Sequence, residues 1–154
     1  MSIQIREAMY NDAPVIVEFN QLMAKETEGK TLDRQRLLKG VQGLLSDRKK
    51  GIYFLAEIDG TVVGQLLVTY EWSDWRNGNF WWIQSVYVRK EQRMLGVFTS
   101  LLHYVDSLAR AQSDTCGLRL YVDHENTRAQ QTYDHLGMKR THYDLYETDF
   151  LRQT

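Results

Sequence analysis

The stretch FWWIQSVYV, residues 80–88, constrains the fold more than any other part of the chain. It is almost continuously apolar and rich in β-branched and aromatic residues, which is typical of a central strand covered on both faces. The joint RKEQRMLG follows it directly, and an amphipathic helix pattern follows the joint. The apolar positions of that helix are Phe98, Leu101, Leu102, Val105 and Leu108. A buried strand that feeds such a helix predicts a strand–helix–strand unit with the helix over the sheet.

The first half of the chain predicts a strand, two helices and a hairpin. Ile3 and Ile5 alternate with polar residues as in a strand, and NDAP then begins a helix with proline in its first turn. A second amphipathic helix places Leu37, Leu38, Val41, Leu44 and Leu45 on one face. Two β-rich runs flank Asp59-Gly60, the dipeptide that suits a tight type I′ turn, so an antiparallel hairpin is expected there.

The second half predicts alternation of strands and helices. GLRLYVD, residues 117–123, has a strand pattern, and NTRAQQTYDHLG has that of a helix capped by Asn126 and ended by Gly137. KRTHYDLYETDF, residues 139–150, is expected to form a last strand or hairpin arm. The resulting order, β-α-α-β-β-β-α-β-α-β, belongs to the α+β class.

Composition limits the classes of partner. Nineteen Lys and Arg residues against twenty Asp and Glu residues leave a formal net charge of -1, so no overall field favours nucleic acid or an anionic membrane. The single cysteine, Cys116, excludes an internal disulfide and indicates a reducing, cytoplasmic setting. No segment has the pattern of a signal peptide or of a membrane span. The length suits one domain, predicted over residues 1–154.

The joint at residues 93–98 predicts an anion site. The first N–H groups of a helix lack intrahelical partners, and the helix dipole adds partial positive charge there. Gly96 leaves the backbone accessible, and Arg93 adds a permanent charge beside it, so phosphate fits without a metal. The alternative is a tight turn with an arginine in solvent. Neither G-x-x-x-x-G-K-[ST] nor G-x-G-x-x-G occurs in the chain, which argues against ATP and dinucleotides.

Two segments carry the resemblance to a known family. RMLGVF is similar to the Q/R-x-x-G-x-G/A loop through Arg93 and Gly96, although Phe98 stands where that pattern ends in Gly or Ala. NTRAQQTYDHLG matches N-x-x-A-x-x-x-Y-x-x-x-G at all four positions, which are Asn126, Ala129, Tyr133 and Gly137. With this order of elements, the chain resembles the GNAT superfamily of acetyl-CoA-dependent N-acetyltransferases. The resemblance implies a mixed, mostly antiparallel sheet with a central splayed parallel strand pair and helices on both faces.

The resemblance also implies a cosubstrate, acetyl-CoA, and a direct transfer. An amine attacks the thioester, a tetrahedral oxyanion forms, and the CoA thiolate leaves. The pantetheine arm would bond to the strand backbone at Val86, Tyr87 and Val88. The other cofactor-binding residues would be Arg93, Met94, Leu95, Gly96, Val97, Phe98 and Asn126.

The resemblance assigns one catalytic residue and leaves the base open. Tyr133 matches the family's tyrosine acid, which protonates the departing thiolate. On pattern alone, a tyrosine at this position is usually a core residue, and an asparagine at position 126 is an ordinary helix cap. The strand offers Gln84 and Ser85 where many relatives have a glutamate, so a base would act through water, or the amine would arrive neutral. Candidates for that base are Glu28, Glu71, Asp74, His124 and Glu125.

The acceptor is expected to be an amine-bearing substrate. Its candidate binding residues are Glu28, Glu71, Trp81, Gln84 and His124. Four tryptophans in a short stretch indicate an aromatic wall, although Trp81 and Trp82 lie on opposite faces of one strand, so at least one must be a core residue. No metal, nucleic acid or membrane partner is expected, and a homodimer stays open. The alternative functions are a catalytically weak acyl-CoA-binding regulatory module and an interaction domain that uses its tryptophans.

Overall fold

The computed structural model describes residues 2–151. The chain divides into two compact units, Met1–Tyr121 and Val122–Thr154. The first unit contains β1 (Ile3–Glu7), α1 (Ala13–Glu28), α2 (Arg34–Leu45), β2 (Ile52–Ile58), β3 (Thr61–Ser73), β4 (Gly78–Val88), α3 (Val97–Arg110) and β5 (Thr115–Arg119). The second contains α4 (Thr127–His135). No helix among residues 2–151 is both long and apolar enough to cross a membrane.

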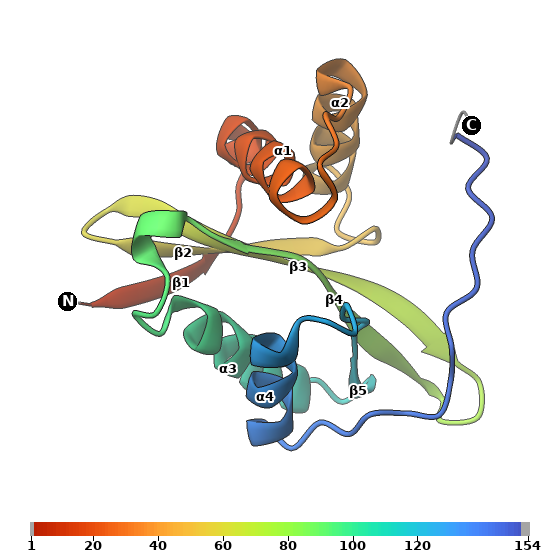
Figure 1. Cartoon of the computed structure of the whole chain (residues 1–154). Helices are drawn as coiled ribbons and strands as arrows, with labels where there is room; N and C mark the ends of the chain where they lie inside the picture. Colours follow the sequence, from red (N-terminus) through yellow and green to blue (C-terminus); the bar gives the residue numbers. More distant parts are fainter. Residues whose placement is uncertain (1, 152–154) are drawn as a thin grey trace. The chain divides into compact units, whose positions relative to one another are not determined.

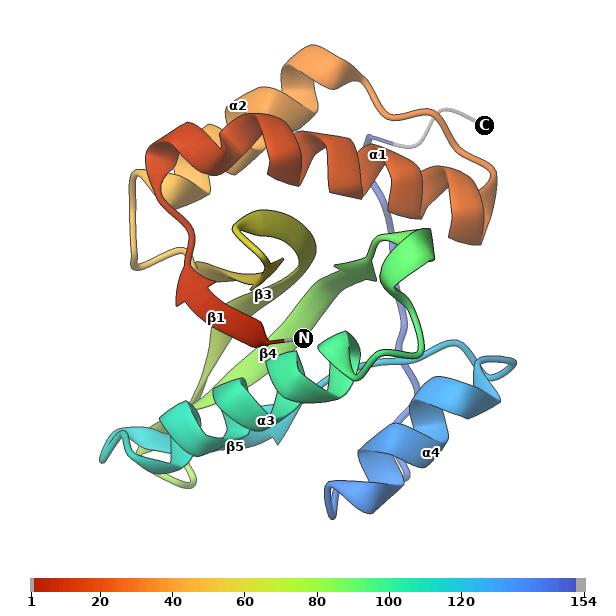
Figure 2. The same ribbon diagram turned by 90° about the vertical axis from the view of Figure 1, so that its left-hand side faces the viewer.

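The sheet of the first unit has the predicted mixed character. Its strand order is β1-β2-β3-β4-β5, with three antiparallel pairs followed by one parallel pair, β4 with β5. Helices α1 and α2 lie on one face and α3 on the other (Figures 1 and 2). The hairpin between β2 and β3 turns at Asp59 and Gly60, whose φ angles of 52° and 78° are those that a type I′ turn needs. The α+β class and helices on both faces are therefore confirmed.

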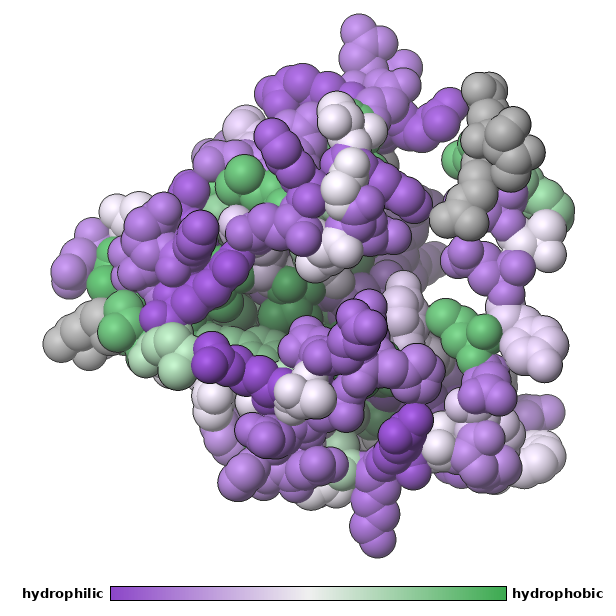
Figure 3. Space-filling view, in the orientation of Figure 1, coloured by the Kyte–Doolittle hydropathy of each residue, from purple (hydrophilic) through white to green (hydrophobic). Residues whose placement is uncertain are grey.

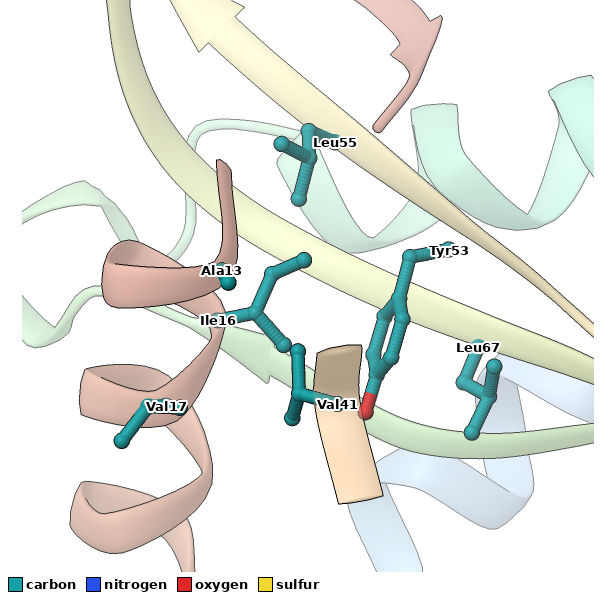
Figure 4. Close-up of a cluster of buried hydrophobic side chains, with 7 residues drawn as sticks. All are labelled: Ala13, Ile16, Val17, Val41, Tyr53, Leu55 and Leu67. Carbon is teal, nitrogen blue, oxygen red and sulfur yellow. The ribbon is translucent and has the colours of Figure 1, made fainter. Parts of the chain in front are cut away.

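The core on the α1–α2 face joins helix and sheet residues predicted from periodicity. Ile16 and Phe19 of α1 are fully buried, and Val41 of α2 is nearly so. Figure 4 shows the cluster that α1 and α2 form with β2 and β3, made of Ala13, Ile16, Val17, Val41, Tyr53, Leu55 and Leu67. In the space-filling view, hydrophobic residues gather in a hollow between the α1–α2 layer and α3, while hydrophilic residues cover the outer surface of α1 and α2 (Figure 3).

The parallel pair is short, and this determines the shape of the site. Residues 79–82 of β4 pair with residues 115–119 of β5, and pairing stops there. The predicted strand at residues 117–123 is thus displaced toward the N-terminus, since β5 ends at Arg119. Beyond Trp82, β4 continues to Val88 while β5 has already ended. Beyond this point β4 is therefore no longer paired with β5, as the splayed pair of the prediction requires.

The second unit confirms the predicted helix but not the predicted last strand. The Oδ1 atom of Asn126 accepts a hydrogen bond from the N–H of Ala129, which caps α4. Gly137 has a φ of 85°, and the N–H of Met138 bonds to the carbonyl of Tyr133, which closes the C-terminal end. The expected strand at residues 139–150 is wrong, because none of these residues has strand pairing. The strand-forming side chains Tyr146 and Phe150 are more than 90% exposed.

Candidate functional site

The open edge of β4 is the first component of the site. Residues 83–88 pair with β3 on one side only, because β5 accompanies β4 no further than Trp82. Strand backbone at an unpaired edge presents N–H and C=O groups that can bond to an extended ligand. The predicted pantetheine-binding residues, Val86, Tyr87 and Val88, lie at the far end of this edge.

The start of α3 is the second component. Gly96 precedes the helix with a φ of 87°, in the left-handed region that favours glycine, and a Cβ placed there would meet no atom within 4 Å. Because Gly96 is the N-cap residue, this position has no side chain that could accept the N–H groups of the first helical turn. A helix N-terminus beside an accessible backbone suits an anion. The anion-binding role of residues 93–98 stays a prediction, with which the backbone conformation at Gly96 is compatible.

A close approach brings these two components together. A Cβ on Gly64 of β3 would lie 3.1 Å from the carbonyl oxygen of Tyr87 and 3.1 Å from Val97 Cγ1. The same Cβ would lie 3.5 Å from Val88 Cγ2. Glycine at this position therefore lets the first residue of α3 pack beside the end of β4. The end of β4 and the start of α3 are therefore close in space.

Arg93 lies at the end of β4, but its charge is already engaged. Its Nε donates to the carbonyl oxygen of Val88 over 2.9 Å, and its Nη2 forms an ion pair with Glu26 at 2.9 Å. The guanidinium also lies over the ring of Tyr87, with 5.3 Å to the centroid. The positive charge predicted beside Gly96 is thus partly neutralised, and a bound anion would compete with Glu26 for it.

Glu71 is a poor candidate for a general base. Its Oε1 accepts a hydrogen bond from Trp82 Nε1 at 3.0 Å and forms an ion pair with Arg119 at 2.8 Å. The hydrogen bond from Trp82 and that from Arg119 hold the pKa of the Glu71 carboxyl below its ordinary value. A carboxylate that is stabilised in its charged form has less affinity for a proton.

The remaining candidates in the first unit have structural partners. Trp81 is 6% exposed and packs edge-on against Tyr70, so of the strand's two tryptophans it is the core residue. The side chain of Gln84 is half-buried and donates to Thr69 Oγ1. Glu28 is exposed at the end of α1, where it pairs with Lys30. In contrast, Trp72 and Trp75 are 59% and 89% exposed, so they are available to a ligand.

The candidates of the second unit lie on or near α4. Tyr133 is half-buried, and this burial raises the pKa of its phenol to about 12. The proton therefore stays on the hydroxyl at any pH near neutrality. His124 is exposed, with its Nδ1 atom 3.4 Å from Arg140 Nη2. Within residues 2–151, no group of three or more His, Cys, Asp or Glu side chains has an arrangement suited to a metal ion.

Sequence reasoning missed several residues that support the site. Glu26 is the partner of Arg93, and Arg119 that of Glu71, across 67 and 48 residues of chain. Gln65 is fully buried, and its side-chain amide donates a hydrogen bond to the carbonyl oxygen of Ser85 in β4. None of these pairings has a periodic signal. The buried glutamine in an otherwise apolar strand run was the one clue available.

Comparison with known proteins supports the resemblance to the GNAT family that the sequence indicates. The model of the Acetyltransferase (GNAT) family matches residues 16–138. A solved structure, described as a possible acetyltransferase from Clostridium difficile 630, is 47% identical, with a TM-score of 0.90, and the alignment covers 99% of this chain and 100% of that one. No curated protein matches the chain.

More distant structures share the fold. A predicted acetyltransferase with acetyl-CoA from Clostridium acetobutylicum is 16% identical with a TM-score of 0.76, over 96% of each chain. A ribosomal-protein-alanine N-acetyltransferase from Brucella melitensis biovar Abortus 2308 is 17% identical with a TM-score of 0.79, over 97% of this chain and 100% of that one. The match to the family model, the near-complete alignment with the C. difficile protein and the geometry above agree: the chain belongs to the GNAT acetyltransferase family.

Proposed function

We propose that this protein transfers an acetyl group from acetyl-CoA to a primary amine of a small molecule or peptide, by direct attack in a ternary complex. GNAT acetyltransferases use acetyl-CoA, and the amine acceptor is the proposed part. The observation that carries the proposal is the open edge of β4, which ends near the start of α3 at Gly96. An extended ligand with an anionic group fits a strand edge that leads to a helix N-terminus.

The proposal assigns the parts of acetyl-CoA to two segments of the chain. The backbone of residues 86–88 would hold the pantetheine arm, and the loop at residues 93–98 would hold the pyrophosphate. Asn126 is assigned a supporting contact in addition to its cap on α4. When bound, the cosubstrate supplies a thioester that an amine can attack. The two compact units are proposed to act as one domain, whereas a homodimer and a cytoplasmic location stay predictions of the sequence.

Tyr133 is proposed to give its hydroxyl proton to the departing thiolate. The assignment rests on its match to the family pattern and on the raised pKa of its phenol, which keeps the proton in place until transfer. The exposed Trp72 and Trp75 are proposed to contact the acceptor, because aromatic faces attract a cationic amine. Glu28 and His124 stay candidates for the polar end of that acceptor.

The base is proposed to act through water, because the central part of β4 offers Gln84 and Ser85 rather than a carboxylate. Gln84→Glu is therefore expected to raise kcat/KM on the acidic side of the pH profile, by about tenfold or more, since a strand carboxylate would accept the proton directly. The measurement is a pH–rate profile beside that of Gln84→Leu, which removes the amide without adding a base. An equal rate for Gln84→Glu and wild type at every pH would contradict the proposal that β4 has no direct base at position 84.

The proposed function is tested by a turnover screen. Release of CoA from acetyl-CoA should be measured with amino acids, polyamines, aminoglycosides and peptide N-termini as acceptors. Acceptor-dependent release, with the acetylated amine identified by mass spectrometry, is the expected result. Tight binding of CoA in a calorimeter without turnover of any amine would favour the alternative, a catalytically weak regulatory module. Absence of CoA binding would contradict both functions.

A further inference from the structure

The middle of β4 contains a β-bulge. Gln84 pairs with Leu67 of β3, and Tyr87 pairs with Gln65, so two residues of β4 face the single residue Leu66. The first of these two, Ser85, has a φ of 50°, which is uncommon for a residue with a Cβ. A bulge changes which face the following side chains occupy and bends the strand. The backbone direction of residues 86–88 is therefore set at Ser85.

The side-chain amide of Gln65, a buried residue of β3, bonds to the backbone of this bulge. Gln65 is 0% exposed, and its Nε2 donates to the carbonyl oxygen of Ser85 over 2.9 Å. The same nitrogen lies 3.5 Å from Oδ1 of Asn20 on α1. Asn20 is itself 6% exposed and donates to the hydroxyl of Tyr53 over 3.2 Å. Three polar side chains thus meet beneath the bulge, within a core that is otherwise apolar.

A glutamine at position 65 and a positive φ angle at Ser85 both lower the stability of the folded state. The Oε1 atom of Gln65 is buried and has no hydrogen-bond partner among the described residues. A buried polar atom without a partner destabilises the folded state, and an apolar side chain of similar size would avoid that loss. The φ angle at Ser85 adds a second local cost, because only glycine adopts that region freely. Two unfavourable features at one place point to a role beyond packing.

We propose that Gln65 is a positioning residue for acetyl transfer. By holding the carbonyl of Ser85 it fixes the bulge, and hence the direction of the N–H and C=O groups of residues 86–88 along the open edge. This inference rests on the proposed function, which assigns those groups to the cosubstrate. Gln65 lies on the α1 face of β3, where its partner Asn20 lies, and acts only through Ser85.

Gln65→Met tests the proposal, because methionine keeps the length and volume but cannot donate to Ser85. A fall in kcat/KM of roughly 10- to 100-fold is expected, as for a small displacement of binding groups. The double variant Gln65→Met, Ser85→Gly should recover part of this loss, since glycine adopts a positive φ without help. Asn20→Leu is the matched control: it removes a buried amide of the same cluster, which bonds to Gln65 and Tyr53 but not to β4. It should lower Tm with a smaller effect on kcat/KM.

A second readout does not depend on activity. The Cα and Cβ chemical shifts of Ser85 report its backbone conformation, and they should move toward extended values in the free Gln65→Met protein. If wild type turns over no amine, the proposed function fails while these shifts still test the bulge. Wild-type kcat/KM in folded Gln65→Met, absence of recovery in the double variant, or unchanged Ser85 shifts would each overturn the role of Gln65.

Discussion

Tyr133→Phe is expected to lower kcat by roughly two to four decades, with the Kd for CoA nearly unchanged. The substitution keeps the ring and removes only the hydroxyl that is proposed to protonate the thiolate. Single-turnover kinetics and calorimetry with CoA measure the two quantities. Tyr104→Phe on α3 is the matched control, because it also removes a phenol hydroxyl from a helix. The Tyr104 ring packs on Phe54. The kcat of Tyr104→Phe should equal that of wild type.

The pH dependence gives an independent check on Tyr133. Burial raises the pKa of this phenol to about 12, so the protonated form, which is the one that can donate, persists throughout the range from neutral pH up to that value. No loss of rate on the basic side should therefore arise from Tyr133 below about pH 11. Equal kcat values for Tyr133→Phe and wild type would return the residue to a packing role. A loss confined to CoA affinity would make it a binding residue.

Gly96→Glu is expected to abolish CoA binding while the protein stays folded. The glutamate would place a negative charge at the N-terminus of α3, where the proposed pyrophosphate site needs the opposite charge. Its side chain would also enter the open space beside Gly96, and the φ of 87° would disfavour any residue with a Cβ. Calorimetry with CoA measures the affinity, and circular dichroism confirms the fold.

Gly60→Glu separates the backbone effect from the site effect. Gly60 has a φ of 78°, also with no atom within 4 Å of an added Cβ, but it lies in the β2–β3 hairpin. The Gly60→Glu protein should lose about as much stability as the Gly96→Glu protein and keep its affinity for CoA. Unchanged affinity in folded Gly96→Glu protein would remove the loop at residues 93–98 from the proposed site.

Local signals in the sequence were enough for much of the fold. Asp59-Gly60 specified its hairpin because few other dipeptides suit two positive φ angles. Asn126 and Gly137 bounded α4 because capping depends on residues within one helical turn. The 139–150 segment failed because a strand needs a partner as well as a pattern, and propensity alone does not provide pairing.

The site was harder to predict because its controlling contacts join distant parts of the chain. Gly96 was found from its place between strand and helix, and its backbone angle agrees with that role. The ion pair of Arg93 with Glu26 crosses 67 residues, so the charge of Arg93 was predictable from the sequence but its partner was not. The bulge at Ser85 depends on the register between β3 and β4, and register does not follow from hydrophobic alternation within a strand buried on both faces.

The parallel pairing of β4 with β5 ends at Arg119. The length of the unpaired part of β4 therefore limits which ligands can reach from the start of α3 to the end of β5. The Arg119 guanidinium lies 3.7 Å from the centroid of the Phe80 ring and is also bound to Glu71, so the last residue of β5 is fixed to the two strands beyond it. Residues 83–88 extend from this point to the joint. At roughly 3.3 Å per residue they span at most about 20 Å, because the bulge at Ser85 bends the strand. A ligand with its charged group at the start of α3 must be about this long to present a reactive group where β4 and β5 meet, so shorter fragments of the same ligand would bind without reacting.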